Sequence, residues 1–147
     1  MKLLAIFSLL FFFAINPPVV TSDQIVGRWM SAEKDLAVEV YKFKDYYAGR
    51  VVWFDCSKPG TPSMAQHYDT ENPNPKLRSR SWLGMNVLDG LRFNGTSEWN
   101  SGTVYDPNTG RTYRTVVRMP SPKTIIVRGY WGIELLGKNM RFNKVGR

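Results

Sequence analysis

The sequence predicts an all-β domain in which about eight strands form a single antiparallel barrel. Short segments alternate apolar and polar residues, clusters of Gly, Pro, Asn and Asp separate them, and no long helical apolar stripe follows residue 22. At 147 residues, the chain is long enough for one domain with its own core. A sheet that closes on itself leaves no unpaired edge, which favours a barrel over an open sheet.

The expected strands follow one another at the spacing of an antiparallel sheet. Leu36, Val38 and Val40 alternate with their neighbours in the pattern of a half-buried strand. Residues 106–110, Asp-Pro-Asn-Thr-Gly, are typical of a tight turn. Prolines exclude a regular helix or central strand from the long connection at residues 57–74. The strands are expected at residues 24–31, 36–41, 47–54, 83–88, 99–105, 111–119, 124–130 and 140–145.

Residues 1–22 have the composition of a secretory signal peptide, and the barrel domain is expected at residues 23–147. Lys2 supplies a positive charge, residues 3–15 form an apolar run, and Val20-Thr21-Ser22 is a Val-x-Ser cleavage pattern. The run is short for a membrane-spanning helix, and a retained N-terminal anchor is the alternative interpretation. We therefore expect a monomeric, exported protein, periplasmic or secreted, that is soluble and has no membrane span after cleavage.

The scarcity of cysteine and histidine excludes several kinds of chemistry. The single cysteine, Cys56, cannot form a disulfide or a thiolate metal cluster within the chain, and we expect it to be buried. The single histidine, His67, has no catalytic motif around it. Residues 132–138 imitate a phosphate-binding loop, but Asn139 replaces the Ser or Thr that would hold magnesium. We therefore expect no catalytic residues, metal or cofactor, and we interpret Asn94-Gly95 as a turn rather than a glycosylation site.

The charge of the chain is strongly positive. The chain contains 20 Lys and Arg residues and 12 Asp and Glu residues, which gives a formal net charge of +8. This charge would attract the protein to an anionic envelope surface such as lipid headgroups or lipopolysaccharide. The alternative is a solvated basic surface, because the cations are spread along the chain. Export argues against a nucleic-acid partner.

A set of motifs in order extends over residues 24–145. Gly27-Arg28-Trp29 resembles the G-x-W element of lipocalins, in which the tryptophan closes one end of the barrel. The further motifs are Val38-Glu39-Val40-Tyr41, Gly49-Arg50-Val51-Val52-Trp53, Asp69, residues 72–80, residues 83–84 and 88–91, Trp99, residues 102–107 and 110–113, residues 127–133 and residues 135–137. Together they resemble the bacterial family called domain of unknown function 2147, small exported proteins whose biochemical role is unassigned. The resemblance implies a lipocalin-like barrel outside the cytoplasm and brings no known activity.

Two Arg-x-Tyr pairs are the candidate ligand anchors. Arg111 and Tyr113 form one pair, and Arg128 and Tyr130 form the other. Residues two apart on a strand share a face, so each pair could bind a carboxylate or phosphate if that face points into the barrel. The alternative is that these arginines lie outside and pair with nearby carboxylates.

Aromatic and loop residues complete the candidates. Trp53 and Trp99 are expected as apolar walls of a ligand cavity, although tryptophans often simply fill a small barrel. Residues expected to have a structural or loop-anchoring role are Arg78, Arg80, Asp106 and Trp29. The family resemblance favours a specific partner for Arg78 or Arg80, and an internal ion pair that fixes the loop would provide one.

The leading functional hypothesis is a non-enzymatic exported barrel that binds a small amphipathic or anionic ligand. The first alternative is a structural or protein-interaction module of the envelope, with a filled barrel and exposed contacts at Trp82 and Trp131. The second is a hydrolase or isomerase built on the barrel. It would need a cleft that joins His67 or paired acids to the arginines.

Overall fold

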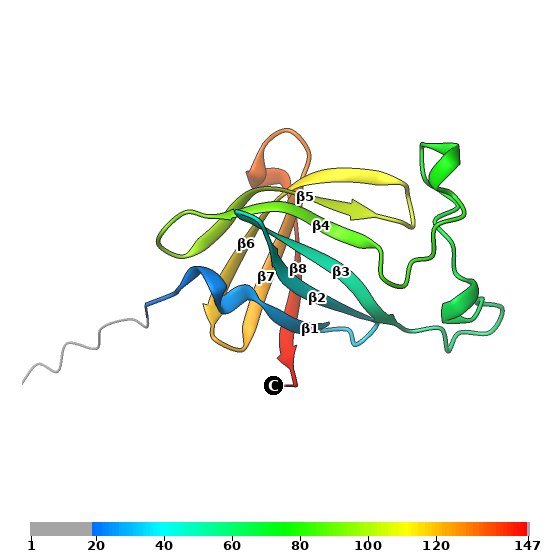
Figure 1. Ribbon diagram of the computed structural model, residues 1–147, viewed down its shortest axis with the longest axis horizontal. Coiled ribbons are helices and arrows are strands. Elements are labelled where there is room, and N and C mark those ends of the chain that lie inside the picture. The colour runs from blue at the N-terminus through cyan, green and yellow to red at the C-terminus, as the bar shows by residue number, and fades with distance from the viewer. Residues whose placement is uncertain (1–18, 147) are drawn as a thin grey trace, which may run out of the picture.

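The computed structural model describes residues 19–146, in which eight strands close into one antiparallel barrel (Figure 1). Each strand pairs with the next along the chain, and β8 pairs with β1 to close the sheet. The strands are β1 (Gly27–Ser31), β2 (Leu36–Phe43), β3 (Tyr46–Phe54), β4 (Asn86–Phe93), β5 (Glu98–Asp106), β6 (Arg111–Ser121), β7 (Thr124–Tyr130) and β8 (Lys138–Val145). The predicted barrel of eight strands is therefore confirmed. Residues 1–18 of the predicted signal peptide lie outside the described residues.

Two strands, β1 and β4, begin three residues later than predicted. Residues expected at the start of the first strand form the 3-10 helix η1 (Ser22–Ile25) instead. β4 begins at Asn86, three residues later than expected, because Gly84 adopts a left-handed φ of 82° in the turn before it. In both cases a local turn replaces the first residues of an expected strand.

Helix η1 closes one end of the barrel, which we call the closed end. The indole Nε1–H of Trp29 donates to the carbonyl oxygen of Ile25 (2.8 Å), and that of Trp99 donates to the carbonyl oxygen of Ser22 (2.9 Å). Both indoles are 0% exposed. The Lys144 ammonium lies 5.1 Å from the centre of the Trp29 ring. The two indole hydrogen bonds join η1 to β1 and β5.

Alternate side chains of the strands fill the middle of the barrel. On β6 and β7, the side chains of Val117, Met119, Ile125 and Val127 are between 0% and 7% exposed. Each of these residues stabilises the fold by about 1.5–3 kcal/mol through burial. Gly102 also faces this core, since a Cβ added there would lie 2.6 Å from Cδ2 of Leu91.

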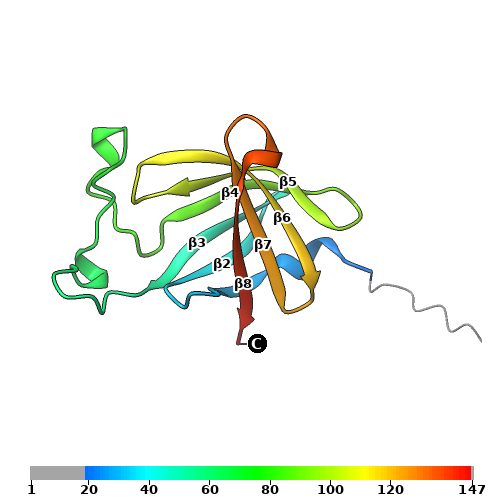
Figure 2. The same ribbon diagram turned by 180° about the vertical axis from the view of Figure 1, so that it is seen from behind.

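The opposite end of the barrel, which we call the loop end, carries the long connection between β3 and β4. This connection contains the single-turn helices η2 (Met64–Gln66) and η3 (Pro75–Leu77). Cys56, which was expected to be buried, is half-buried and packs against the core with Met64 and Trp82. Both views place the connection beside the β5–β6 hairpin (Figure 2).

Among residues 19–146, no helix has the length and apolar character needed to cross a membrane.

Candidate functional site

At the loop end, the inward-facing side chains of β6 and β7 become progressively exposed to solvent. On β6, Thr115 is 0% exposed, Tyr113 is half-buried and Arg111 is exposed. On β7, Gly129 pairs with Thr115 and is half-buried. A Cβ added to Gly129 would lie 3.2 Å from Cγ1 of Val104 and 3.8 Å from Cβ of Tyr113. The inward-facing side chains of these strands are therefore partly exposed to solvent at the loop end.

The same gradient follows β8. Phe142 is 5% exposed, Met140 is 37% exposed and Lys138 is exposed, and all three share the inward face through their pairing with β7. The cause is the shortness of β1, which ends at Ser31 opposite Phe142. Met140 and Lys138 consequently have no β1 residue beside them.

We call this set of inward-facing residues the mouth. Its wall consists of Val104, Tyr113, Gly129 and Met140, and its rim carries the cations Arg111 and Lys138. An apolar wall with a few cationic groups at its edge can hold an apolar chain that ends in a carboxylate or phosphate. Arg111 and Tyr113 are among the ligand anchors predicted from the sequence. Val104, Met140 and Lys138 are not, because strand register decides which residues of a strand face inward.

The β3–β4 connection covers the neighbouring part of the loop end through a buried carboxylate. Asp69 is 0% exposed. Its carboxylate accepts hydrogen bonds from the Tyr105 hydroxyl (2.6 Å), Nδ2 of Asn72 (2.7 Å) and Nη2 of Arg80 (2.7 Å). These contacts fix the connection to β5.

The same contacts determine the charges of this network. Burial raises the pKa of the Asp69 carboxyl, but the hydrogen bonds from Tyr105, Asn72 and Arg80 outweigh burial and hold it below the ordinary value of 3.8. Burial, together with the hydrogen bond to Asp69 and its negative charge, raises the pKa of Tyr105 to about 12. The network therefore holds an ionised carboxylate beside a neutral phenol at neutral pH.

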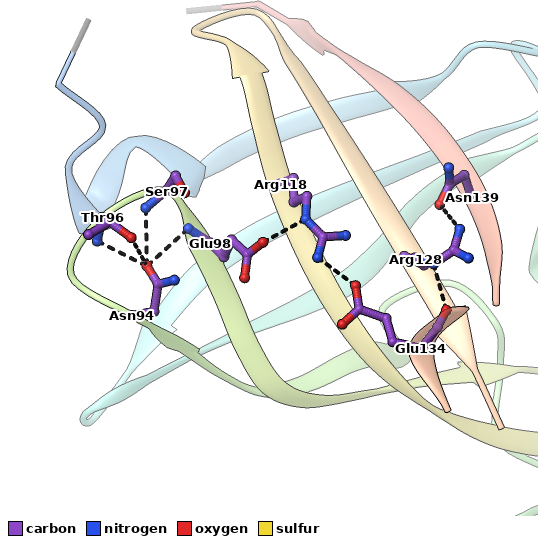
Figure 3. Close-up of polar contacts among 8 residues, drawn as sticks. All are labelled: Asn94, Thr96, Ser97, Glu98, Arg118, Arg128, Glu134 and Asn139. Atoms are coloured by element: carbon purple, nitrogen blue, oxygen red, sulfur yellow. Dashed lines mark hydrogen bonds and ion pairs between the residues drawn. The ribbon is translucent and has the colours of Figure 1, made fainter. Parts of the chain in front are cut away.

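Arg128 and Tyr130 lie on the outer face of the barrel, contrary to the expectation that both Arg-x-Tyr pairs could converge inside. On β7 the inward positions are Ile125, Val127 and Gly129, so the residues between them face outward. Nε of Arg128 donates to the carbonyl oxygen of Glu134 (2.8 Å), and Nη1 donates to Oδ1 of Asn139 (2.7 Å) (Figure 3). The Arg128 guanidinium thus holds the β7–β8 connection and does not reach the mouth.

Trp53 and Trp99, which were expected to line a ligand cavity, also lie away from the mouth. Trp99 is buried at the closed end, and Trp53 is 37% exposed. A register shift on β3 pairs Val38 with Val51 but Ala37 with Trp53, so Val52 is an extra residue. This bulge turns Phe54 inward and leaves Trp53 outside. Neither tryptophan lines the mouth.

The remaining candidates make contacts within the loops or at the closed end. Arg80 forms the ion pair with Asp69, and Nε of Arg78 donates to the carbonyl oxygen of Asn72 (2.8 Å). Oδ1 of Asp106 accepts the backbone N–H of Asn108 (3.0 Å) within the β5–β6 turn. Trp29 caps the closed end, as described above. His67 lies against Trp82, with ring centres 4.1 Å apart.

Two shallow hollows lie on the outer face of β5, β6 and β7. The smaller has a volume of about 280 Å³, the larger has a volume of about 560 Å³, and both are lined by Arg114 and Tyr130. Beside them, Nε of Arg118 pairs with Glu98 (2.6 Å) and Nη2 pairs with Glu134 (2.5 Å) (Figure 3). Among residues 19–146, no group of three or more His, Cys, Asp or Glu side chains could hold a metal ion.

The closed antiparallel barrel with one capped end defines the chain as a lipocalin-like barrel. A solved structure, protein HP1028 from the human pathogen Helicobacter pylori, is described as belonging to the lipocalin family. It matches with a TM-score of 0.71 and 21% identity, and the match covers 83% of each chain. Residues 27–144 match the model of a family described as "Uncharacterized protein conserved in bacteria (DUF2147)", and the protein belongs to this family. No curated protein matches the chain.

Proposed function

We propose that this protein is an exported, non-enzymatic binding protein that holds a small amphipathic anion in the mouth. The observation that carries the proposal is the partial exposure of inward-facing apolar side chains at the loop end of β5, β6 and β8. There Val104, Tyr113 and Met140 are half-buried or partly exposed rather than covered by protein. Binding an apolar chain against them would remove this surface from water.

The charges at the rim favour an anionic head group. Arg111 and Lys138 are exposed at the inward edges of β6 and β8, and neither forms an ion pair with another residue in the range 19–146. A carboxylate or phosphate held between them would gain charge-assisted hydrogen bonds. Such a ligand would have one acidic group and an apolar chain.

The polar groups at the loop end support binding rather than catalysis. Asp69, Arg80 and Tyr105 bond to one another, and the His67 ring packs against aromatic rings. A general acid or base must reach the reacting group of a substrate. These side chains are engaged in fixing the β3–β4 connection.

Native mass spectrometry tests this proposal on protein recovered without denaturation from the extracytoplasmic fraction of its own host. We expect a bound mass on the wild-type chain and its loss when Arg111→Gln and Lys138→Gln are combined. The control is Arg141→Gln, because Arg141 lies on β8 between two inward-facing residues but faces outward. A wild-type chain without bound mass, or equal retention by the rim variant, would contradict the proposal.

A further inference from the structure

The connection between β7 and β8 exposes a group of large apolar side chains. We call residues 131–137, which include the 3-10 helix η4 (Glu134–Leu136), the apolar loop. Trp131 is 75% exposed, Ile133 59%, Leu135 83% and Leu136 77%. Adjacent exposed apolar residues on this scale mark a surface that contacts an apolar partner.

The barrel wall holds the apolar loop in this position. The Arg128 guanidinium donates to the backbone carbonyls of Glu134 and Leu135, each at 2.8 Å. The only carboxylate of the loop, that of Glu134, pairs with Arg118 (Figure 3). Gly137 packs so closely that an added Cβ would lie 2.7 Å from the carbonyl oxygen of Gly129. The polar groups of the loop therefore bond to the wall while its apolar side chains project into solvent.

The surroundings of the apolar loop are cationic. Arg111, Arg114 and Lys138 are exposed and form no ion pairs within residues 19–146. The smaller hollow places Arg114 beside Tyr130 and Trp131. Apolar side chains, aromatic rings and free cations on one surface match the successive layers of a lipid bilayer with anionic headgroups.

We propose that the apolar loop inserts into the interfacial layer of an anionic bilayer. Ile133, Leu135 and Leu136 enter the apolar layer, and Trp131 lies at the depth of the headgroups. Arg114 and Lys138 bind lipid phosphates. A bilayer fits better than a protein partner, because four side chains on one short loop are few for a stable protein interface, which buries roughly 1,200–2,000 Å². This docking does not depend on a ligand in the mouth.

Vesicle sedimentation tests the docking with residues 19–147. This range holds the complete barrel and omits the apolar run at residues 3–15, which would bind bilayers by itself. We expect the protein to sediment with phosphatidylcholine vesicles that contain phosphatidylglycerol, and binding should weaken as salt rises. The double variant Leu135→Ser, Leu136→Ser should bind about tenfold or more weakly.

Two further variants separate the contributions. Arg114→Gln combined with Lys138→Gln should abolish the preference for phosphatidylglycerol. The control Phe43→Ser, at the closed end where Phe43 is 46% exposed, should bind like the wild type. Thermal melting by circular dichroism confirms that each variant is folded. Absence of wild-type sedimentation, or wild-type binding by the Leu135→Ser, Leu136→Ser variant, would overturn the proposal. So would a wild-type dimer that this variant dissociates, since a second copy would then cover the loop.

Discussion

At the scale of single residues, the Asp69 carboxylate determines how the long β3–β4 connection is held. It is the acceptor for three side chains that come from β5 and from both parts of the connection around η3. A buried carboxylate is stable only with such partners, since an unpartnered charge inside a protein is costly. Removing the charge should therefore weaken the packing of the connection and change how the free energy of unfolding depends on pH.

We predict that Asp69→Asn lowers the free energy of unfolding by about 2 kcal/mol at neutral pH, because hydrogen bonds to a charged acceptor are lost. The folded state holds the pKa of Asp69 below 3.8, so the unfolded state takes up the proton first as pH falls. The stabilisation is complete above about pH 4 and is lost as pH falls through the folded-state pKa. Urea unfolding across this range should show a shallower acid dependence for the variant. Parallel curves for the two proteins would rule out this role for Asp69.

At the scale of elements, the alternation of apolar and polar residues predicted the strands. It did not determine which side chains of each strand point into the barrel. On β7 the positions 125, 126 and 127 are all aliphatic, so both faces of the strand read as apolar in the sequence. Only the pairing with β6 shows that Arg128 faces outward. On β3 one extra residue at Val52 reverses the alternation and turns Trp53 outward. A bulge of this kind has no reliable signal in a single sequence. The turns that separate the strands do have one, because they are rich in Gly, Pro, Asn and Asp.

We predict that Arg128→Gln loosens the apolar loop without unfolding the barrel. The Arg128 guanidinium bonds to two backbone carbonyls of the loop, and glutamine is too short and has too few donors to replace both bonds. Hydrogen–deuterium exchange of residues 133–137 should become about tenfold faster, the equivalent of one or two lost hydrogen bonds. Arg141→Gln is the matched control on the next strand. Unchanged exchange in residues 133–137 would show that other contacts hold the loop.

At the scale of the whole molecule, η1 caps one end of the barrel, and inward-facing side chains are partly exposed at the other. The cap depends on residues close to the predicted cleavage site, since the Ser22 carbonyl accepts the indole N–H of Trp99. The mouth and the apolar loop both lie at the loop end, where β5 and β7 end and β6 and β8 begin. The proposed ligand site and the proposed bilayer contact would therefore lie at the same end of the protein.

We predict that the host exports the protein and cleaves it after Ser22, so that N-terminal sequencing begins at Asp23. Cleavage there removes the Ser22 carbonyl, and the processed chain should be about 1 kcal/mol less stable than residues 19–147. Denaturant unfolding compares the two forms. Recovery of the uncleaved chain from the cytoplasm would contradict the predicted export.

The most direct test of the central claim is nuclear magnetic resonance of the methionine methyl groups, labelled with carbon-13, during titration with a long-chain fatty acid. Met140 lies in the wall of the mouth, whereas Met119 is 7% exposed near the closed end and serves as an internal control. We expect the Met140 signal to shift in proportion to bound ligand and the Met119 signal to stay in place. The shift should disappear in the Arg111→Gln, Lys138→Gln variant. Titration without a shift of Met140, or with equal shifts of both methyl groups, would contradict ligand binding in the mouth.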